Sequence, residues 1–158
     1  MTVNTKTAAR RTLHFESLDD LLADVDAAGD APGSTGNWTA AQNVEHVSRL
    51  IGGSFDGFDA KGPLLIRLLL KVMRGSVLNR PMKPGIKLPA NFTAFVPPAD
   101  VTWADATAHL RRLVERARAG EQMTHPSPIL GAMSNEDWVK LHCRHAEMHF
   151  GFIQPAAG

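Results

Sequence analysis

The sequence has a single cysteine, almost no net charge and no long apolar run. Cys143 cannot form an internal disulfide, and Met1–Arg11 lacks the apolar core of a secretory signal, so we expect a cytoplasmic protein. The 17 Lys and Arg residues balance 16 Asp and Glu, and a net charge of +1 gives no electrostatic argument for general nucleic-acid binding. The most apolar run, 63–70, is interrupted by Arg67 and is far shorter than the roughly 20 residues that span a bilayer.

Composition and patterning favour one helical domain. The chain has 158 residues, of which 44% are hydrophobic and 21% charged, as in an ordinary globular domain. No stretch alternates between polar and apolar residues as a strand does, and no internal repeat is visible. We therefore expect a single all-α domain over residues 1–158, with a flexible segment at 1–11.

Four stretches combine a helix-capping pattern with an apolar stripe of helical period, which predicts a four-helix bundle. The predicted helices start at Ser17, run from Thr39 to about Ala60, run from Thr102 to near Gly120, and run from Glu136 to about Ile153.

The chain between the second and third helices has two parts. Residues 63–77 are very apolar and carry Arg67, Lys71 and Arg74 one turn apart, which is typical of a short amphipathic helix packed on the surface. A membrane-surface or partner-binding stripe is the alternative. Prolines then exclude regular helix over 81–98, and we expect a long crossover there that covers one end of the bundle. The apolar residues that this crossover is expected to bring to the mouth of a site are Leu88, Phe92 or Phe95.

Three of the seven histidines lie within eight positions in the last predicted helix. At 100° per residue, His142, His145 and His149 face the same side of that helix. His145 and His149 have the i, i+4 spacing by which helical histidines chelate a transition metal. The alternative is that they line the bundle interior and hydrogen-bond to neighbouring groups.

His46, in the second predicted helix, is the candidate for a third ligand. It lies on a small, polar line of that helix that includes Gly53 and Gly57, and Gly52 is adjacent. Each glycine within a helix costs about 1 kcal/mol relative to alanine, which indicates that something approaches this backbone closely. A histidine on such a face could be a ligand from across the bundle, or a partly exposed helix residue.

The other histidines and the cysteine do not belong to a recognisable ligand pattern. His14 and His109 are expected at the surface, whereas His125, in a loop before a proline, is the one that could reach the mouth of the site. Cys143 lies about 160° around the helix from His145, so we expect it to be buried and to bind no metal.

Taken together, these features resemble the DinB-like superfamily, and most closely an uncharacterised branch known only as a domain of unknown function. The residues that carry the resemblance are His46, the crossover 81–89, the loop 125–131, Trp138 and the run 145–149, within a similarity that covers about Arg11 to Gln154. The resemblance implies a four-helix bundle that binds one divalent metal through His46, His145 and His149. Met148 stands where many relatives have a further histidine, which leaves His142 as a candidate for orienting a ligand ring or lining the pocket.

Three neutral imidazoles leave the charge of a divalent ion uncompensated and leave coordination positions open, as in catalytic sites. Imidazole suits Zn, Ni, Cu and Fe, and we expect Zn, Ni or Fe without a choice among them. Characterised members of the superfamily include thiol-dependent transferases and an isomerase. The resemblance therefore implies a metal-dependent thiol S-transferase that joins a low-molecular-weight thiol to a small electrophile.

Other functions stay open at this point. They are a hydrolase that uses metal-bound hydroxide, a non-catalytic metal- or ligand-binding bundle, and a scaffold that docks through Arg67, Lys71 and Arg74. Glu45 and Glu147 are adjacent to candidate ligands but point about 100° away, so we assign no catalytic residue. The expected partner is a small-molecule substrate, with no nucleic acid, and a homodimer stays open.

Overall fold

The computed structural model describes residues 2–59, 61–85 and 92–156, and this part of the chain is mostly helical. The expected all-α class is confirmed at that level, with one addition, a sheet of two short strands. Within the described ranges, no helix has the length and apolar character needed to cross a membrane.

The elements in chain order are α1 (Leu18–Ala27), β1 (Gly33–Ser34), α2 (Ala40–Asp56), α3 (Leu64–Val72), α4 (Arg74–Asn79), the 3₁₀ turn η1 (Thr93–Phe95), α5 (Trp103–Arg118), α6 (Asn135–Phe150) and β2 (Ile153–Gln154).

The four long helices begin where the capping patterns predict. In each, a Ser or Thr side chain accepts a hydrogen bond from the backbone N–H three residues later, which satisfies one of the free donors of the first turn. The capping residues are Ser17, Thr39, Thr102 and Ser134.

Two helix ends differ from the prediction. α2 ends at Asp56 because Gly57 turns the backbone to a φ of +101°, and Ala60 lies outside the described residues. α6 ends at Phe150, and Ile153, which was expected in the helix, pairs in antiparallel register with Ser34. This second expectation was wrong because a two-residue strand pairing is too short to leave a periodic signal.

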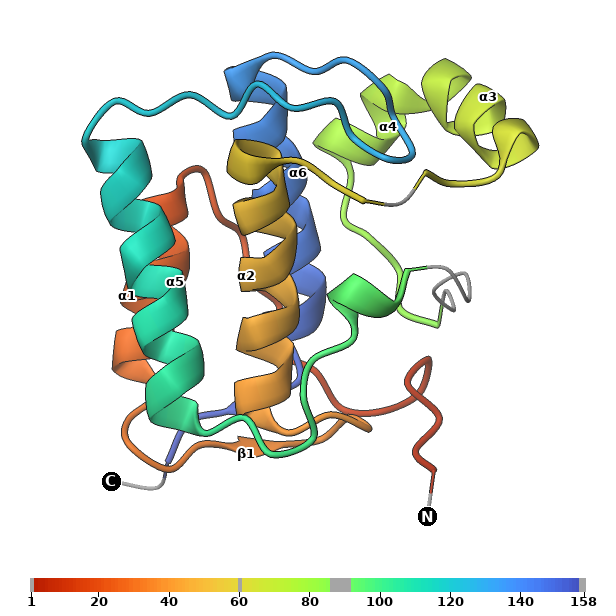
Figure 1. Ribbon diagram of the computed structural model, residues 1–158. Helices are drawn as coiled ribbons and strands as arrows, with labels where there is room; N and C mark the ends of the chain where they lie inside the picture. The colour runs from red at the N-terminus through yellow and green to blue at the C-terminus, as the bar shows by residue number, and fades with distance from the viewer. Residues whose placement is uncertain (1, 60, 86–91, 157–158) are drawn as a thin grey trace.

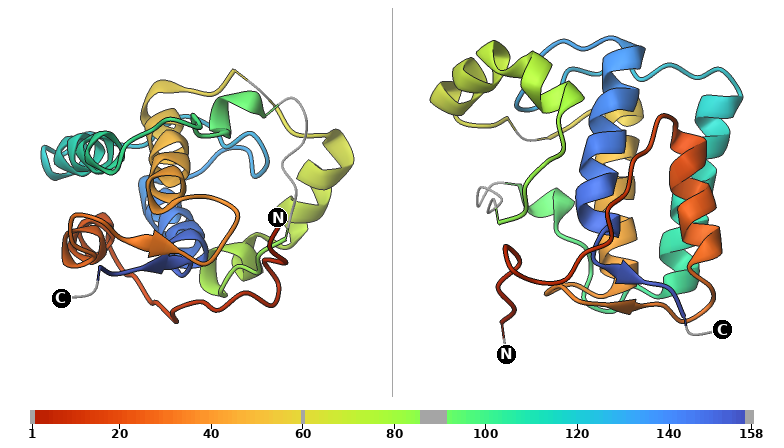
Figure 2. Two further views of the ribbon diagram at one scale, coloured as in Figure 1. Left: turned by 90° about the horizontal axis from the view of Figure 1, so that it is seen from below. Right: turned by 180° about the vertical axis from the view of Figure 1, so that it is seen from behind.

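The helices α1, α2, α5 and α6 lie alongside one another, and α2 packs against both α5 and α6 (Figure 1). The views from below and behind show the same arrangement, with the short sheet closing the end near both termini (Figure 2). The predicted apolar stripes supply the core between them. Fully buried members of this core include Leu21, Val44, Val47, Ile51, Leu110, Val114, Trp138 and Phe150.

The apolar segment 63–77 does not form one helix packed on the surface. It breaks at Met73 into α3 and α4, and α3 has no buried residue and projects away from the long helices (Figures 1 and 2). Arg74, expected on an open basic edge, donates instead to the Asp137 carboxylate at 2.7 Å and to the Ala132 carbonyl at 2.8 Å.

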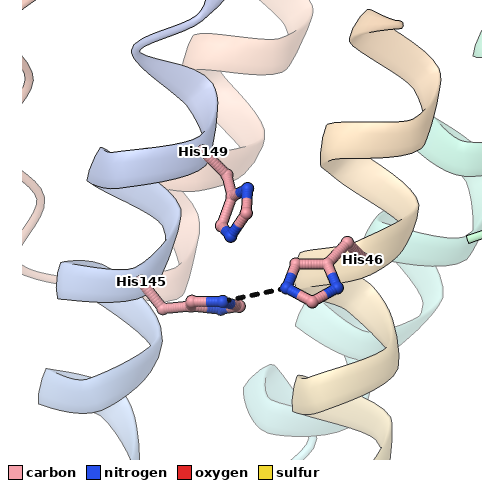
Figure 3. A group of neighbouring side chains, drawn as sticks. All are labelled: His46, His145 and His149. Atoms are coloured by element: carbon pink, nitrogen blue, oxygen red, sulfur yellow. Dashed lines mark hydrogen bonds between the residues drawn. The ribbon is translucent and has the colours of Figure 1, made fainter. Parts of the chain in front are cut away.

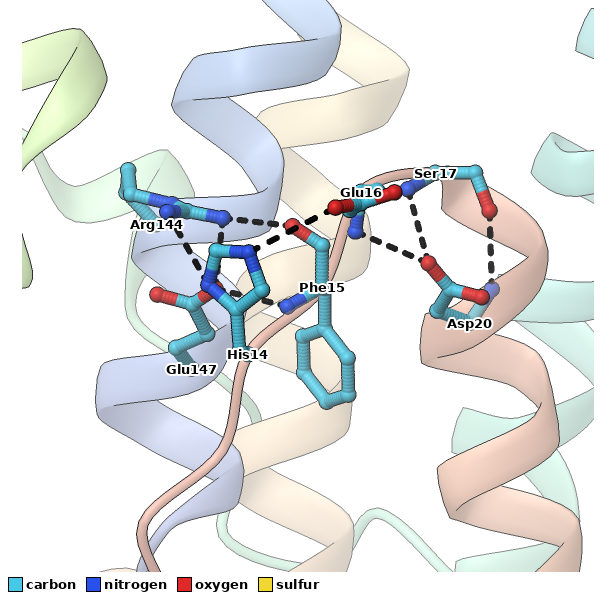
Figure 4. Close-up of polar contacts among 7 residues, drawn as sticks. All are labelled: His14, Phe15, Glu16, Ser17, Asp20, Arg144 and Glu147. Carbon is cyan, nitrogen blue, oxygen red and sulfur yellow. Dashed lines mark hydrogen bonds and ion pairs between the residues drawn. The ribbon is translucent and has the colours of Figure 1, made fainter.

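Polar contacts hold the segment before α1 against α6 (Figure 4). Glu147, which is buried, accepts from the Phe15 backbone N–H at 2.7 Å and pairs with Arg144 at 2.6 Å. Arg144 also donates to the Phe15 carbonyl at 2.5 Å. The expected flexibility of 1–11 does not extend to Arg11, which makes a bidentate pair with Asp24.

Candidate metal centre

Three of the predicted ligands converge between α2 and α6 (Figure 3). His46 projects from α2, and His145 and His149 project from successive turns of α6. One ring nitrogen from each lies within 4.8 Å of the other two. The Nε2 atoms of His46 and His145 are 3.1 Å apart. The i, i+4 pair and the histidine from the other helix therefore meet, as the sequence predicts.

A backbone carbonyl orients the His46 ring. Its Nδ1 lies 2.7 Å from the carbonyl oxygen of Phe95, in η1. A carbonyl only accepts hydrogen bonds, so Nδ1 carries the proton and donates it. Nε2 of His46 is then an unprotonated nitrogen with its lone pair facing the other two rings, which is the state that a metal ligand needs.

The side chain of Asn43 orients His149 in the same way. Its Oδ1 lies 3.2 Å from Nδ1 of His149. The amide nitrogen of Asn43 donates to the Thr39 carbonyl at 2.9 Å, which identifies the other atom as the oxygen acceptor. Nδ1 of His149 is therefore the protonated nitrogen, and its Nε2 is also available as a ligand.

The His145 ring has an incomplete set of hydrogen bonds. Its Nδ1 is buried and has no partner among the described residues, and its Nε2 faces Nε2 of His46. Two unprotonated nitrogens at 3.1 Å repel each other unless a proton or a cation lies between them. Nitrogens that bind one ion at about 2.0–2.1 Å lie no more than about 4.2 Å apart. The donor atoms of the three rings all lie within 4.8 Å of one another, close to this limit, so the donor set could hold one metal ion.

Burial keeps this group of imidazoles neutral. Desolvation is the largest cause that lowers the pKa of His46, and it also lowers the pKa values of His145 and His149 well below the usual range. The mutual repulsion of the rings adds to the shift of both α6 histidines. Only neutral imidazole binds a metal, so the three rings are in the binding form at neutral pH.

Trp38 forms a wall of the site that the sequence analysis missed. Its indole stacks on His149 with ring centroids 5.6 Å apart and 18° between the planes, and it lies 4.8 Å from the His46 ring. Trp38 precedes the N-cap of α2, so no helical periodicity points to it. Asn43 lies three residues before His46 on α2, but helical spacing alone does not reveal its contact with α6.

The other candidates lie elsewhere. His142 is fully buried, its Nε2 is 3.0 Å from Oγ of Ser54, and its ring stacks on Trp138. Burial lowers the pKa of His142 to about 3. These contacts do not include a ligand ring, so the expected orienting role has no support in them. His125 packs against Gly57 rather than against the three ligands.

Of the crossover residues expected at the mouth of the site, Phe95 contacts His46 through its backbone carbonyl and not through its apolar ring. The Phe92 ring stacks on the Phe95 ring, with 5.5 Å between the centroids. Leu88 lies outside the described residues.

The close approach expected at the α2 glycines is confirmed at Gly53. A Cβ added there would lie 2.2 Å from the Phe58 ring, so the Phe58 side chain fills that space.

Both carboxylates next to the ligands are engaged in ion pairs. Glu45 pairs with Arg49 and with His109, each at 2.8 Å, so His109 is half-buried rather than a free surface residue. The hydrogen bonds from these partners hold the pKa of Glu45 below its usual range despite the opposing effect of burial. Glu147 is held by Arg144, as described above.

Cys143 is buried, as expected from the sequence. Cys143 is 1% exposed. Burial raises the pKa of its thiol to about 12, so the thiol stays protonated at neutral pH.

These features define a mostly helical protein with a partly buried three-histidine group that could hold a metal ion. The chain belongs to the family described as a protein of unknown function, DUF1569, whose model matches residues 7–156. Comparisons with curated proteins and with solved structures find no match.

Proposed function

We propose that the four long helices form a DinB-like bundle, a single domain over 1–158, and that its function is that of a divalent-metal-dependent thiol S-transferase. His46, His145 and His149 would hold the ion through Nε2. The observation that carries this proposal is the convergence of the three rings, two of them with Nδ1 committed to an oxygen acceptor. Transfer to a thiol rests on the resemblance to the superfamily.

The residues of the chain have definite tasks in this proposal. A bound zinc, nickel or iron ion would act as a Lewis acid that favours the thiolate form of a low-molecular-weight thiol. The Phe95 carbonyl and the Asn43 side chain hold two ligand rings, which limits their reorganisation when the ion binds. Trp38 supplies an apolar surface beside those rings, against which a small electrophile can pack.

Two alternatives remain as competitors. Hydrolysis by metal-bound hydroxide commonly uses a carboxylate as base, and the two nearest in sequence, Glu45 and Glu147, are held in ion pairs. This observation favours thiol chemistry over hydrolysis. The second alternative is a bundle that binds a metal or ligand without catalysis. Cytoplasmic location and a small-molecule substrate belong to the same proposal.

Metal content tests the site itself. Protein purified without an affinity tag is analysed for bound metals and then titrated with zinc and nickel, alongside the His46→Ala, His145→Ala and His149→Ala variants. We expect about one ion per chain in the wild type and loss of most of it in each variant, because two ligands no longer link α2 to α6. The exposed His14→Ala variant is the matched control and should bind as the wild type does. Equal affinity in wild type and His46→Ala would show that no site links the helices.

Activity tests the reaction. The metal-loaded protein is incubated with a panel of small electrophiles and with glutathione, mycothiol or bacillithiol, and the loss of free thiol is measured. We expect catalysis with one of these thiols, and its loss in His46→Ala. Hydrolysis of the same substrates without thiol would favour the hydrolase, and full metal binding with neither reaction would favour the non-catalytic bundle.

A further inference from the structure

The helix α3 exposes an unusually apolar surface. Seven of the nine exposed large hydrophobic side chains of the described residues lie within 64–73. Leu65 is 81% exposed and Val72 is 87% exposed. Such a concentration on one element differs from the scattered apolar residues of an ordinary surface and marks an interaction site. The seven residues are Leu64, Leu65, Ile66, Leu68, Leu69, Val72 and Met73.

Five of the seven exposed side chains form one face of α3. At 100° per residue, Leu64, Leu65, Leu68, Leu69 and Val72 occupy an arc of about 140°. The opposite side carries the half-buried Leu70, which packs against the core. The apolar arc therefore faces away from the molecule. α3 projects from the long helices in each view, so the body of the protein leaves this face open (Figures 1 and 2).

The sequence around α3 contains basic residues but no acidic ones. Between Asp59 and Asp100 the sequence has seven Lys and Arg residues and no Asp or Glu, whereas the rest of the chain has 10 basic and 16 acidic residues. Lys71 is exposed and lies about 20° from the edge of the apolar arc. Arg67 lies about 40° further around the helix. Two of the seven basic residues, Lys71 and Arg67, thus lie beside the apolar arc of α3.

We propose that α3 docks on an anionic lipid surface, with the apolar arc in the boundary between headgroups and acyl chains and Lys71 and Arg67 at the headgroups. This is the arrangement of an interfacial amphipathic helix, which needs an apolar face and flanking cations but not the length to span the bilayer. The proposal is independent of the metal site.

Charge and size both disfavour a second copy of the chain as the occupant. Two copies paired through α3 would bring two basic edges together, whereas anionic lipid neutralises them. A helix of nine residues is about 14 Å long and presents roughly a few hundred Å² on one face, against about 800 Å² per partner in a stable interface.

Vesicle binding tests the proposal on the full chain. Protein is sedimented with vesicles of phosphatidylcholine alone and of phosphatidylcholine with 30% phosphatidylglycerol. We expect binding to the anionic vesicles that is at least tenfold tighter than to the neutral ones and that weakens when NaCl rises from 0.05 to 0.5 M. Absence of binding to anionic vesicles, or equal binding to both kinds, would overturn the proposal.

Substitutions locate the contact. The Leu65→Glu/Leu69→Glu double variant should lose more than tenfold in affinity, and Lys71→Gln about fivefold. Val96→Glu, at another exposed apolar residue, is the matched control and should bind as the wild type does. Thermal unfolding followed by circular dichroism checks that the variants fold. Sedimentation velocity that shows a dimer, dissolved by the Leu65→Glu/Leu69→Glu change, would instead assign the face to a second copy and contradict the lipid proposal.

Discussion

Acidification of the metal-free protein should destabilise it through His142. This ring is fully buried, stacks on Trp138 at 5.1 Å between centroids, and places Nε2 at 3.0 Å from Oγ of Ser54. Its Nδ1 is buried and has no partner among the described residues. A proton on that nitrogen would create a buried charge without a compensating group, and this is why burial lowers the pKa of His142 to about 3.

The sign and size of the effect follow from proton linkage. In the unfolded chain His142 has the usual pKa of about 6.5. Between pH 6.5 and 3 the unfolded state therefore binds a proton that the folded state does not bind. The contribution of the neutral ring to stability is fully present above pH 6.5 and is lost as the pH falls toward 3. From pH 7 to pH 4.5 the loss from this one residue is about 2.5 kcal/mol.

Urea unfolding at pH 7 and pH 4.5, in the presence of a chelator, measures this loss. The wild type should lose about 2.5 kcal/mol more between the two pH values than His142→Phe, which keeps an aromatic ring against Trp138 but cannot titrate. The site histidines titrate in both proteins, so the difference isolates His142. Ser54→Ala, which removes only the hydrogen-bond partner, should keep most of the wild-type pH dependence. Parallel pH curves for wild type and His142→Phe would refute the reasoning.

Further predictions concern the contacts around the site. Asn43→Ala removes the acceptor of the His149 Nδ1–H and should weaken zinc binding 10- to 100-fold in a competition titration, whereas Ser48→Ala, also buried on α2, should not. Glu147→Ala leaves Arg144 as a buried cation and should lower the free energy of unfolding by about 3–5 kcal/mol in urea titrations. Bound metal should be released by acid only below pH 6.5, because burial lowers the pKa values of all three ligands; complete release above pH 7 would contradict this.

The parts of the fold that local chemistry determines could be predicted from the sequence. Ser17 and Thr39 cap their helices through side chains that bond to backbone three residues away, so the signal lies within one turn. The shared face of His145 and His149 is equally local, since it follows from helical geometry alone. What periodicity could not establish was that His46 faces them from another helix, 99 residues before His145 in the sequence.

The features that depend on long-range packing were missed or misplaced. Trp38 reaches the site through a loop whose path no periodic pattern encodes. Phe95 contributes a backbone carbonyl rather than its apolar ring, and any residue type could have supplied that carbonyl. The segment 63–77 was expected to pack on the surface because it is apolar. Its helix α3 faces outward because only one of its sides meets the core, and composition does not reveal which neighbours a helix finds.

The three imidazoles of the proposed metal centre are positioned by the protein itself. Val44 and Val47 on α2, and Trp138 on α6, are fully buried in the core between the long helices, so apolar packing fixes the spacing of those helices. The Phe95 carbonyl and Asn43 then set the orientation of two ligand rings. In small zinc domains the binding energy is the folding energy, because the site does not exist without the ion. Here the packing of the core offsets the unfavourable free energy of bringing three imidazoles together. Part of that unfavourable free energy comes from Nδ1 of His145, which is buried without a hydrogen-bond partner among the described residues. In the proposed centre, the free energy of metal binding would therefore go into affinity and into polarising a bound ligand rather than into folding, as in catalytic zinc sites.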